Sequence, residues 1–266
     1  IIATADLRTT MGSPIFADHR PEADAACIVR LRAAGAFVFG KTVTTPFAFM
    51  DPGKTHNPWD PVHTPGGSSS GSAAAVAAGH VNAAIGTQTN GSVIRPAAYC
   101  GVVGFKPTLD IIPFAGIGVF SPTFDTVGTF TRAVADAARL ASVLAGSGSI
   151  AAAITPVARK PRLAYIGDFP WTQLDCHADA VVEAAATTLR TQTSNGPPHS
   201  ASPRHGAQSG LPALHDIFVG AHCRAVIVLP GATGSSVQAK PMGHASWAPH
   251  GVVQNASREE SASKHE

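Results

Sequence analysis

The chain has 266 residues, enough for one large domain or two small ones with a buried core. Apolar residues make up 44% and charged residues 14%, with 26 Gly and 21 Pro, a composition that excludes collagen, a coiled coil and an acidic tail. The formal net charge of +2 comes without a basic run. We therefore expect a small-molecule partner, with no nucleic acid and no membrane surface.

The cysteine pattern predicts neither a metal site nor a disulfide framework. The four cysteines lie far apart, with no Cys-x-x-Cys pair and no histidine at ligand spacing: Cys27, Cys100, Cys176 and Cys223. This usage favours a reducing cytoplasm. No stretch approaches the roughly 18 unbroken apolar residues of a membrane-spanning helix. The chain opens Ile1-Ile2-Ala3 without Met or a signal sequence, so we expect it to begin inside a longer natural protein.

The first elements predicted along the chain lead to a lysine and then to a Gly/Ser loop. Residues 21–34 have apolar side chains at helical spacing, with Pro at the start and Gly just beyond the end, and predict a helix. Residues 36–39 (AFVF) predict a short buried strand with Lys41 at its exit. Eight Gly and Pro residues in 51–71 predict a loop. A helix of small residues is expected at 72–79.

Strands and helices continue to alternate up to about residue 190, which predicts an α/β layered domain. The elements expected there are strands at 83–86 and 162–166, helices at 133–144 and 177–189, a polar turn at 87–91 before Ser92, and short elements at 102–105 and near Ile111.

The composition changes near residue 191. The last 76 residues hold seven of the twelve His, seven Pro and ten Ser, but only twelve Leu, Ile, Val and Phe together, too few for a packed core. We expect a domain at 1–190 and an irregular tail at 191–266, structured only at 217–219 and 225–229. The abrupt change resembles translation in a wrong frame, so a truncated, frameshifted product is a hypothesis.

Two short motifs match but lack the structural context that each needs. Residues 35–42 satisfy the phosphate-binding pattern G-x-x-x-x-G-K-[ST], yet the intervening residues are the predicted strand and Pro46 follows soon after, so no helix N-terminus is available. Residues 67–71 satisfy G-x-S-x-G, but a Pro/Gly loop precedes them where the nucleophile elbow has a strand. A flexible linker is the third reading of this Gly/Ser run.

The surroundings of the run favour an acyl-transfer site instead. An Ala-rich helix follows it directly, and after the strand at 83–86 comes a second Gly/Ser turn ending at Ser92. A serine nucleophile needs a base, and a turn of small residues lets several N–H groups point at one developing oxyanion. Lys41, which directly follows the predicted strand at 36–39, is a candidate base.

Four stretches give this site a specific family resemblance: GKT at 40–42, TPGGSSSGSAAA at 64–75, GTQTNGS at 86–92 and PAAYCGVVGFKPT at 96–108. They resemble the amidase signature family, with a looser match from residue 1 to about 190. The resemblance implies an α/β fold, with a mixed β-sheet sandwiched between α-helical layers, here incomplete and without the family's N-terminal helices. It also implies a Ser-cisSer-Lys triad and no metal or cofactor.

By position, the resemblance makes Ser92 the nucleophile, Ser68 the bridging serine in a cis peptide and Lys41 the base. It places the oxyanion hole on the backbone N–H groups of Thr89, Asn90, Gly91 and Ser92. The residues agree with these roles, because a lysine accepts a proton only when neutral, and an apolar setting with few acids lowers its pKa. A hydroxyl can donate and accept at once, so Ser68 can relay the proton.

Three positions depart from the family's pattern. Many members have Asp four residues before the nucleophile and Arg two residues after it, where this chain has Gln88 and Ile94. Losing both together avoids an unpaired buried charge, and Arg95, one step on, is a candidate for orienting the loop. Pro46 stands where many relatives have Glu.

We expect a cytoplasmic amide hydrolase acting on a small-molecule amide, with a homodimer left open. The first alternative is the amidase subunit of a tRNA-dependent amidotransferase, which would need a partner and an ammonia channel. The second is a truncated, inactive fragment that keeps the triad residues but folds incompletely, with uncovered strand edges that favour aggregation.

Overall fold

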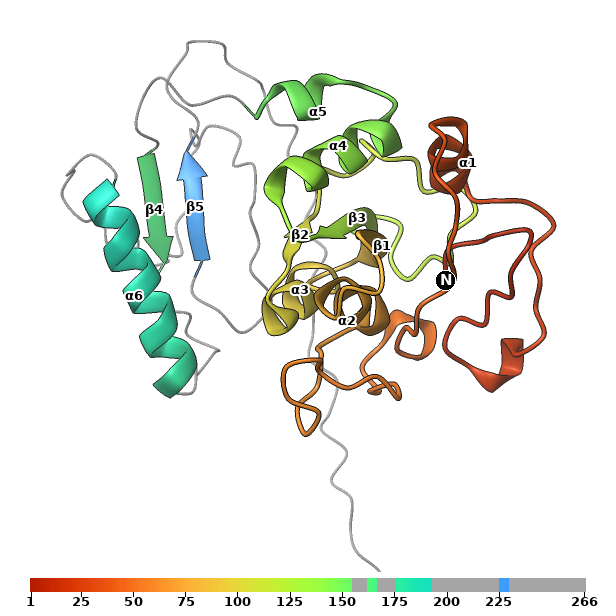
Figure 1. Cartoon of the computed structure of the whole chain (residues 1–266), viewed down its shortest axis with the longest axis horizontal. Helices are drawn as coiled ribbons and strands as arrows, with labels where there is room; N and C mark the ends of the chain where they lie inside the picture. Colours follow the sequence, from red (N-terminus) through yellow and green to blue (C-terminus); the bar gives the residue numbers. More distant parts are fainter. Residues whose placement is uncertain (155–161, 167–175, 193–224, 230–266) are drawn as a thin grey trace, which may run out of the picture. The chain divides into compact units, whose positions relative to one another are not determined.

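A computed structural model describes residues 1–154, 162–166, 176–192 and 225–229 (Figure 1). The main sheet of this part has three antiparallel strands in the order β1-β3-β2. Their bounds are β1 Ala83–Gln88, β2 Val103–Phe105 and β3 Thr126–Thr131. Thr129 of the central strand lies opposite Ile85 on one side and Phe105 on the other.

The central strand β3 is buried along its whole length, and each of its two faces contributes side chains to a different hydrophobic cluster. Side chains alternate between faces of a strand, so Val127 and Phe130 point to opposite sides. Val127 belongs to one buried cluster and Phe130 to the other. A strand covered on both faces requires a helical layer on each side of the sheet.

Helices supply both layers. Helices α2 (Ser70–Ala77) and α3 (Ile94–Cys100) pack on one side of the strands and α4 (Val134–Ala145) on the other (Figure 1). Helix α1 (Ala26–Ala33) packs against α4. The short helix α5 (Ser149–Ala152) comes directly after α4 in the chain and also packs against it.

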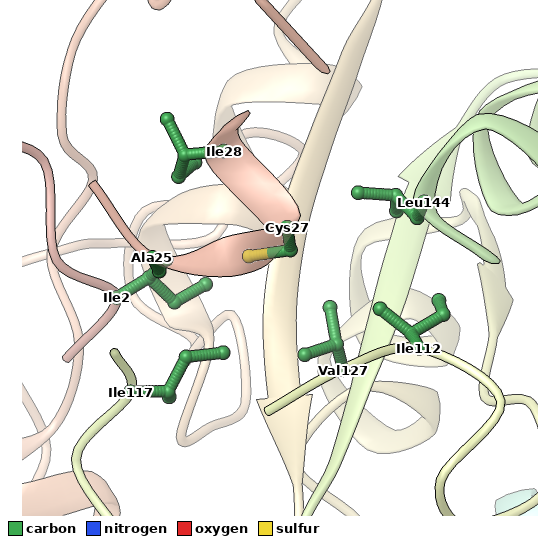
Figure 2. Packing of buried hydrophobic residues seen from close by; sticks show 8 residues of the cluster. All are labelled: Ile2, Ala25, Cys27, Ile28, Ile112, Ile117, Val127 and Leu144. Carbon is green, nitrogen blue, oxygen red and sulfur yellow. The ribbon is translucent and has the colours of Figure 1, made fainter. Parts of the chain in front are cut away.

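The first cluster joins the start of the chain to the sheet. Figure 2 shows Ile2 and the residues at the start of α1 on one side, with Val127 of β3 and Leu144 of α4 on the other. The Cys27 sulfur lies among these side chains, and burial raises the pKa of this thiol to about 11. Cys27 and Cys100 are both free and buried.

The second cluster lies between α2, α3 and β3, and most of its members are small: Ala73, Val76, Val93, Ala97, Cys100 and Phe130. Small side chains let the two helices approach the sheet closely. Because α2 and α3 begin just after the two Gly/Ser loops, this packing fixes where both loops lie.

The remaining elements are the strands β4 (Arg162–Ile166) and β5 (Ala225–Leu229), which pair antiparallel, and the helix α6 (Cys176–Gln192). Two single 3-10 turns occur at Pro14–Phe16 and Pro46–Ala48. Among the helices that the structure describes, none combines the length and apolar character needed to span a bilayer.

Most predicted elements are confirmed, with small shifts at their ends. The expected helices correspond to α1, α2, α4 and α6, and the expected strands at 83–86 and 162–166 to β1 and β4. The short element expected at 102–105 is β2, and the structured stretch expected at 225–229 is β5. The predicted element at 217–219 lies outside the described residues. The expected boundary at residue 190 falls two residues before the end of α6.

Three predictions differ from the structure. Residues 36–39 form no strand, because no neighbouring strand in the described part pairs with them, and Phe37 and Phe39 are 79% and 75% exposed. Helix α3 and strand β3 were not predicted. Pro96 lies inside α3 but in its first turn, where its missing N–H is not needed.

The burial of Phe130 predicts a large loss of stability on truncation. Phe130 is fully buried, so Phe130→Ala should lower the free energy of unfolding by about 3–5 kcal/mol. Phe37→Ala makes the same chemical change at an exposed position and should change it by about 0.5 kcal/mol or less. Denaturant titrations of both variants measure the difference, and equal losses would contradict the assigned core.

Candidate active site

The three predicted catalytic residues lie on three segments that the fold brings together. Lys41 lies in an extended segment before the turn at Pro46–Ala48, Ser68 precedes α2, and Ser92 precedes α3. Both serines are buried, with exposed fractions of 3% and 6%. Helices α2 and α3 pack against each other, so the serines lie at the starts of neighbouring helices.

Backbone hydrogen bonds join the lysine segment to the first serine loop. The Gly71 N–H donates to the Val43 carbonyl at 2.9 Å, and the Thr45 N–H donates to the Ser68 carbonyl at 3.1 Å. Gly71 is needed here, because a Cβ on it would lie 2.5 Å from the Val43 nitrogen. The segment that carries Lys41 is therefore held against the first serine loop by these bonds.

The two serine loops are also bonded to each other. The Ser69 N–H donates to the Ser92 carbonyl at 3.3 Å. The peptide between Gly67 and Ser68 is cis, as the family resemblance implied for the bridging serine.

The Lys41 amine lies among neutral oxygens from the start of the chain. It donates to the Ile2 carbonyl and to the hydroxyls of Thr9 and Thr4, at 3.0 and 3.3 Å for the two hydroxyls. Although the residue as a whole is exposed, burial of the amine lowers the pKa of Lys41 to about 8, and the Asp6 charge partly opposes this shift. The sequence predicted the lowered pKa but placed its cause in residues 36–39. The oxygens that enclose the amine were not anticipated.

The hydroxyl of Ser68 is fully enclosed and has no hydrogen-bond partner among the described residues. Neither Ser92 nor the Lys41 amine bonds to it in this arrangement. A buried hydroxyl without a partner costs about 1–3 kcal/mol, and such groups call for an explanation, of which a catalytic role is one. The relay from Ser92 through Ser68 to Lys41 stays a prediction.

The turn from Thr89 to Ser92 has backbone N–H groups free to bind an anion. Within the described part of the chain, none of these four N–H groups donates a hydrogen bond to another protein group. Two of the turn's carbonyls, by contrast, are engaged, since Gly91 accepts from the Arg95 N–H at 2.8 Å and Ser92 from the Ser69 N–H at 3.3 Å. Free donors on consecutive residues suit a developing oxyanion.

Gln88 fixes the end of this turn. Its side chain is 2% exposed, and Oε1 accepts from the N–H groups of Val93 at 2.8 Å and Ile94 at 2.9 Å. These are among the N–H groups at a helix start that have no partner within the helix. A neutral amide therefore caps α3 at the position where many relatives have Asp.

Asp125 is a site residue that the sequence analysis missed. Its buried carboxylate accepts from the Thr89 hydroxyl at 2.5 Å and from the N–H groups of Phe120 and Ser121 at 2.6 and 2.8 Å. It thus holds the first residue of the turn. No local motif marks it, and the only signal is a lone acid before a Thr/Val run in a weakly charged chain.

A cavity of about 590 Å³ opens beside Lys41, with Arg8, Met11 and Lys54 among its lining residues. Neither Ser68 nor Ser92 lines it, so we do not assign it as the substrate pocket. No group of three or more His, Cys, Asp or Glu that could hold a metal ion occurs among the residues described.

Comparison with known proteins gives a family match over most of the chain. The Amidase family model matches residues 1–197. A glutamyl-tRNA(Gln) amidotransferase subunit from Pseudothermotoga lettingae is 44% identical over 151 residues, which cover 54% of this chain and 32% of the relative. The corresponding protein from Anaeromyxobacter sp. (strain K) is 39% identical over 208 residues, covering 71% of this chain and 42% of the relative.

Comparison with solved structures also finds amidases similar to this chain. The native peptide amidase of Stenotrophomonas maltophilia superposes with a TM-score of 0.58 at 33% identity, covering 72% of this chain and 44% of that structure. This likeness confirms the predicted fold class. The chain spans between about a third and two fifths of the length of the curated relatives it matches.

The capping role of Gln88 predicts a loss of stability without its acceptor. Gln88→Met leaves two N–H groups of α3 unsatisfied and should lower the free energy of unfolding by about 1–3 kcal/mol. Gln88→Glu keeps an acceptor oxygen in place and should lose less. Urea titration compares the two, and a Met variant as stable as the Glu variant would rule out the cap.

Proposed function

Because the chain belongs to the amidase family, we propose that it hydrolyses a carboxylic amide through an acyl-enzyme formed on Ser92, in the cytoplasm. The observation that carries this proposal is the turn from Thr89 to Ser92, whose four N–H groups have no acceptor among the described residues. Losing one such donor typically costs about 3 kcal/mol of transition-state stabilisation. The proposed substrate is a small-molecule amide.

In the proposed reaction, the Ser92 hydroxyl oxygen attacks the amide carbon. Its proton passes to Ser68 Oγ, while the Ser68 proton passes to the neutral Lys41 amine. The tetrahedral intermediate then expels ammonia or an amine, which takes the proton back along the same relay as the C–N bond breaks. Water repeats the sequence on the ester and releases the acid.

The surroundings of Ser68 and Lys41 support these roles. The unpartnered Ser68 hydroxyl can accept from Ser92 and donate to the lysine. The proposed relay requires the Lys41 amine to rotate from its present partners to this hydroxyl, and the lysine segment is already bonded to the Ser68 carbonyl through Thr45. With a pKa near 8, an appreciable fraction of the amine is neutral at physiological pH.

A second candidate is the amidase subunit of a tRNA-dependent amidotransferase. The supporting observation is 44% identity to a relative named for that activity. In that role the chain would release ammonia from an amide donor and pass it to a partner that binds the tRNA. Hydrolysis of simple amides by the isolated chain favours the first candidate, whereas glutamine hydrolysis that requires a partner protein favours the second. The inactive fragment remains the third reading.

Labelling with a fluorophosphonate tests the nucleophile. The wild-type chain should be labelled on Ser92, and Ser92→Ala should abolish labelling. Ser68→Ala removes the proton relay and should slow labelling by roughly 10²–10⁴-fold. Ser142→Ala is the matched control, because this hydroxyl is also buried but accepts from the Ala151 N–H, away from the serine loops, and it should leave the rate within about threefold. A wild-type chain that is not labelled and shows no cooperative thermal transition would support the inactive fragment, whereas an unlabelled chain with a cooperative transition would contradict Ser92 as the nucleophile.

The lowered pKa of Lys41 predicts how labelling depends on pH. Below pH 8 the amine is mostly protonated and cannot accept a proton, so the rate should rise with pH and level off above about pH 9. Lys41→Arg carries a group that stays protonated and should be slow, without an inflection near pH 8. Lys54→Arg should keep the wild-type profile. An unchanged profile in Lys41→Arg would remove lysine from the mechanism.

A further inference from the structure

Arg95 is bonded to both serine loops at once. Its backbone N–H donates to the Gly91 carbonyl at 2.8 Å, inside the turn that contains Ser92. Its side chain donates from Nε to the Gly67 carbonyl at 3.1 Å. That carbonyl belongs to the peptide that joins Gly67 to Ser68.

This contact is one of three hydrogen bonds that the structure describes between the two loops. In the other two, the Ser69 N–H donates to the Ser92 carbonyl and the Ser69 hydroxyl donates to the Thr87 carbonyl at 3.3 Å. Helices α2 and α3 start directly after the loops and lie side by side (Figure 1), but they restrain only the residues after each serine. On the side that precedes Ser68, the Arg95 side chain bonds to the Gly67 carbonyl, next to the serine, and the Cys100 thiol bonds to the Pro65 carbonyl at 3.5 Å, further along the loop.

We propose that Arg95 is a positioning residue, which sets the distance between Ser68 and Ser92 by holding the Gly67 carbonyl against the start of α3. It acts on the reacting atoms only through Ser68. The catalytic consequence of this inference rests on the proposed roles of the two serines.

The guanidinium group of Arg95 is suited to holding the Gly67 carbonyl in a fixed position. The guanidinium is planar and delocalised, and Nε has a fixed direction relative to its stem, so the bond constrains orientation as well as distance. Among the described ion pairs, Arg95 takes part in none. Gln88, at the end of β1, is neutral, and its side-chain oxygen accepts from the two N–H groups at the start of α3. The guanidinium is thus free to serve the Gly67 carbonyl.

The test compares Arg95→Met and Arg95→Lys with Arg132→Met in the full chain. Arg132 is a matched control, because its guanidinium also donates to backbone carbonyls, those of Val76 and Val81, away from the serines. Two readouts are measured on each protein: hydrogen exchange of the Ser69 amide, and the second-order rate of fluorophosphonate labelling.

We expect Arg95→Met to speed exchange of the Ser69 amide at least tenfold and to slow labelling by about 10–100-fold, since small misplacements of reacting groups have effects of this size. Arg95→Lys keeps the charge but not the fixed direction and should fall between Met and wild type. Arg132→Met should leave both readouts unchanged, even if it lowers the melting temperature equally.

Unchanged Ser69 exchange in Arg95→Met overturns the inference, whether or not the wild-type chain is labelled. An Arg95→Met variant that is labelled at the wild-type rate overturns the inference as well. Should Arg95→Met fail to fold, the lysine variant decides by the same two readouts. A wild-type chain that is never labelled, but whose Ser69 amide responds as expected, refutes the proposed function and leaves the positioning role standing.

Discussion

The hydrogen bonds between residues 42–45 and the loop before α2 are the constraint on which the rest of the site depends. They use main-chain groups of Val43, Thr45, Ser68 and Gly71, and the approach is possible because Gly71 has no side chain. The lysine segment and the serine loop are therefore joined without using the Lys41 amine or the Ser68 hydroxyl. The amine instead donates to Ile2, Thr4 and Thr9, and the hydroxyl has no partner among the described residues.

The environment of the Lys41 amine shows how burial without a negative partner in contact favours the neutral form of an amine. A carboxylate in contact would favour the ammonium and raise the pKa. Instead, neutral oxygens of Ile2, Thr4 and Thr9 satisfy the donors. The nearby Asp6 is paired with Arg32 at 2.9 Å, which weakens its pull on the amine. Burial then dominates, and it lowers the pKa.

Local pattern predicted much of this architecture, and its failures have physical causes. The helices at α1, α2 and α4 follow from their spacing, but α3 carries Pro96, and β3 interrupts its Thr and Val with Gly128, so neither is distinctive locally. Residues 36–39 have strand composition, yet a strand exists only beside a partner, and no local sequence supplies one. The catalytic positions came from a long motif, whereas Asp125 acts across 36 residues of chain and only the folded structure reveals it.

The three hydrogen bonds of Asp125 also join the two ends of the site mechanically. Phe120, one of its donors, stacks its ring on Phe49 at a centroid distance of 5.8 Å. The Phe49 carbonyl in turn accepts from the Thr45 hydroxyl at 2.6 Å, and Thr45 belongs to the segment that carries the lysine. Contacts thus run without a break from the segment that carries Lys41 to the turn at residues 89–92, through an exposed aromatic pair. We expect a group that inserts between these two rings to disturb both segments together.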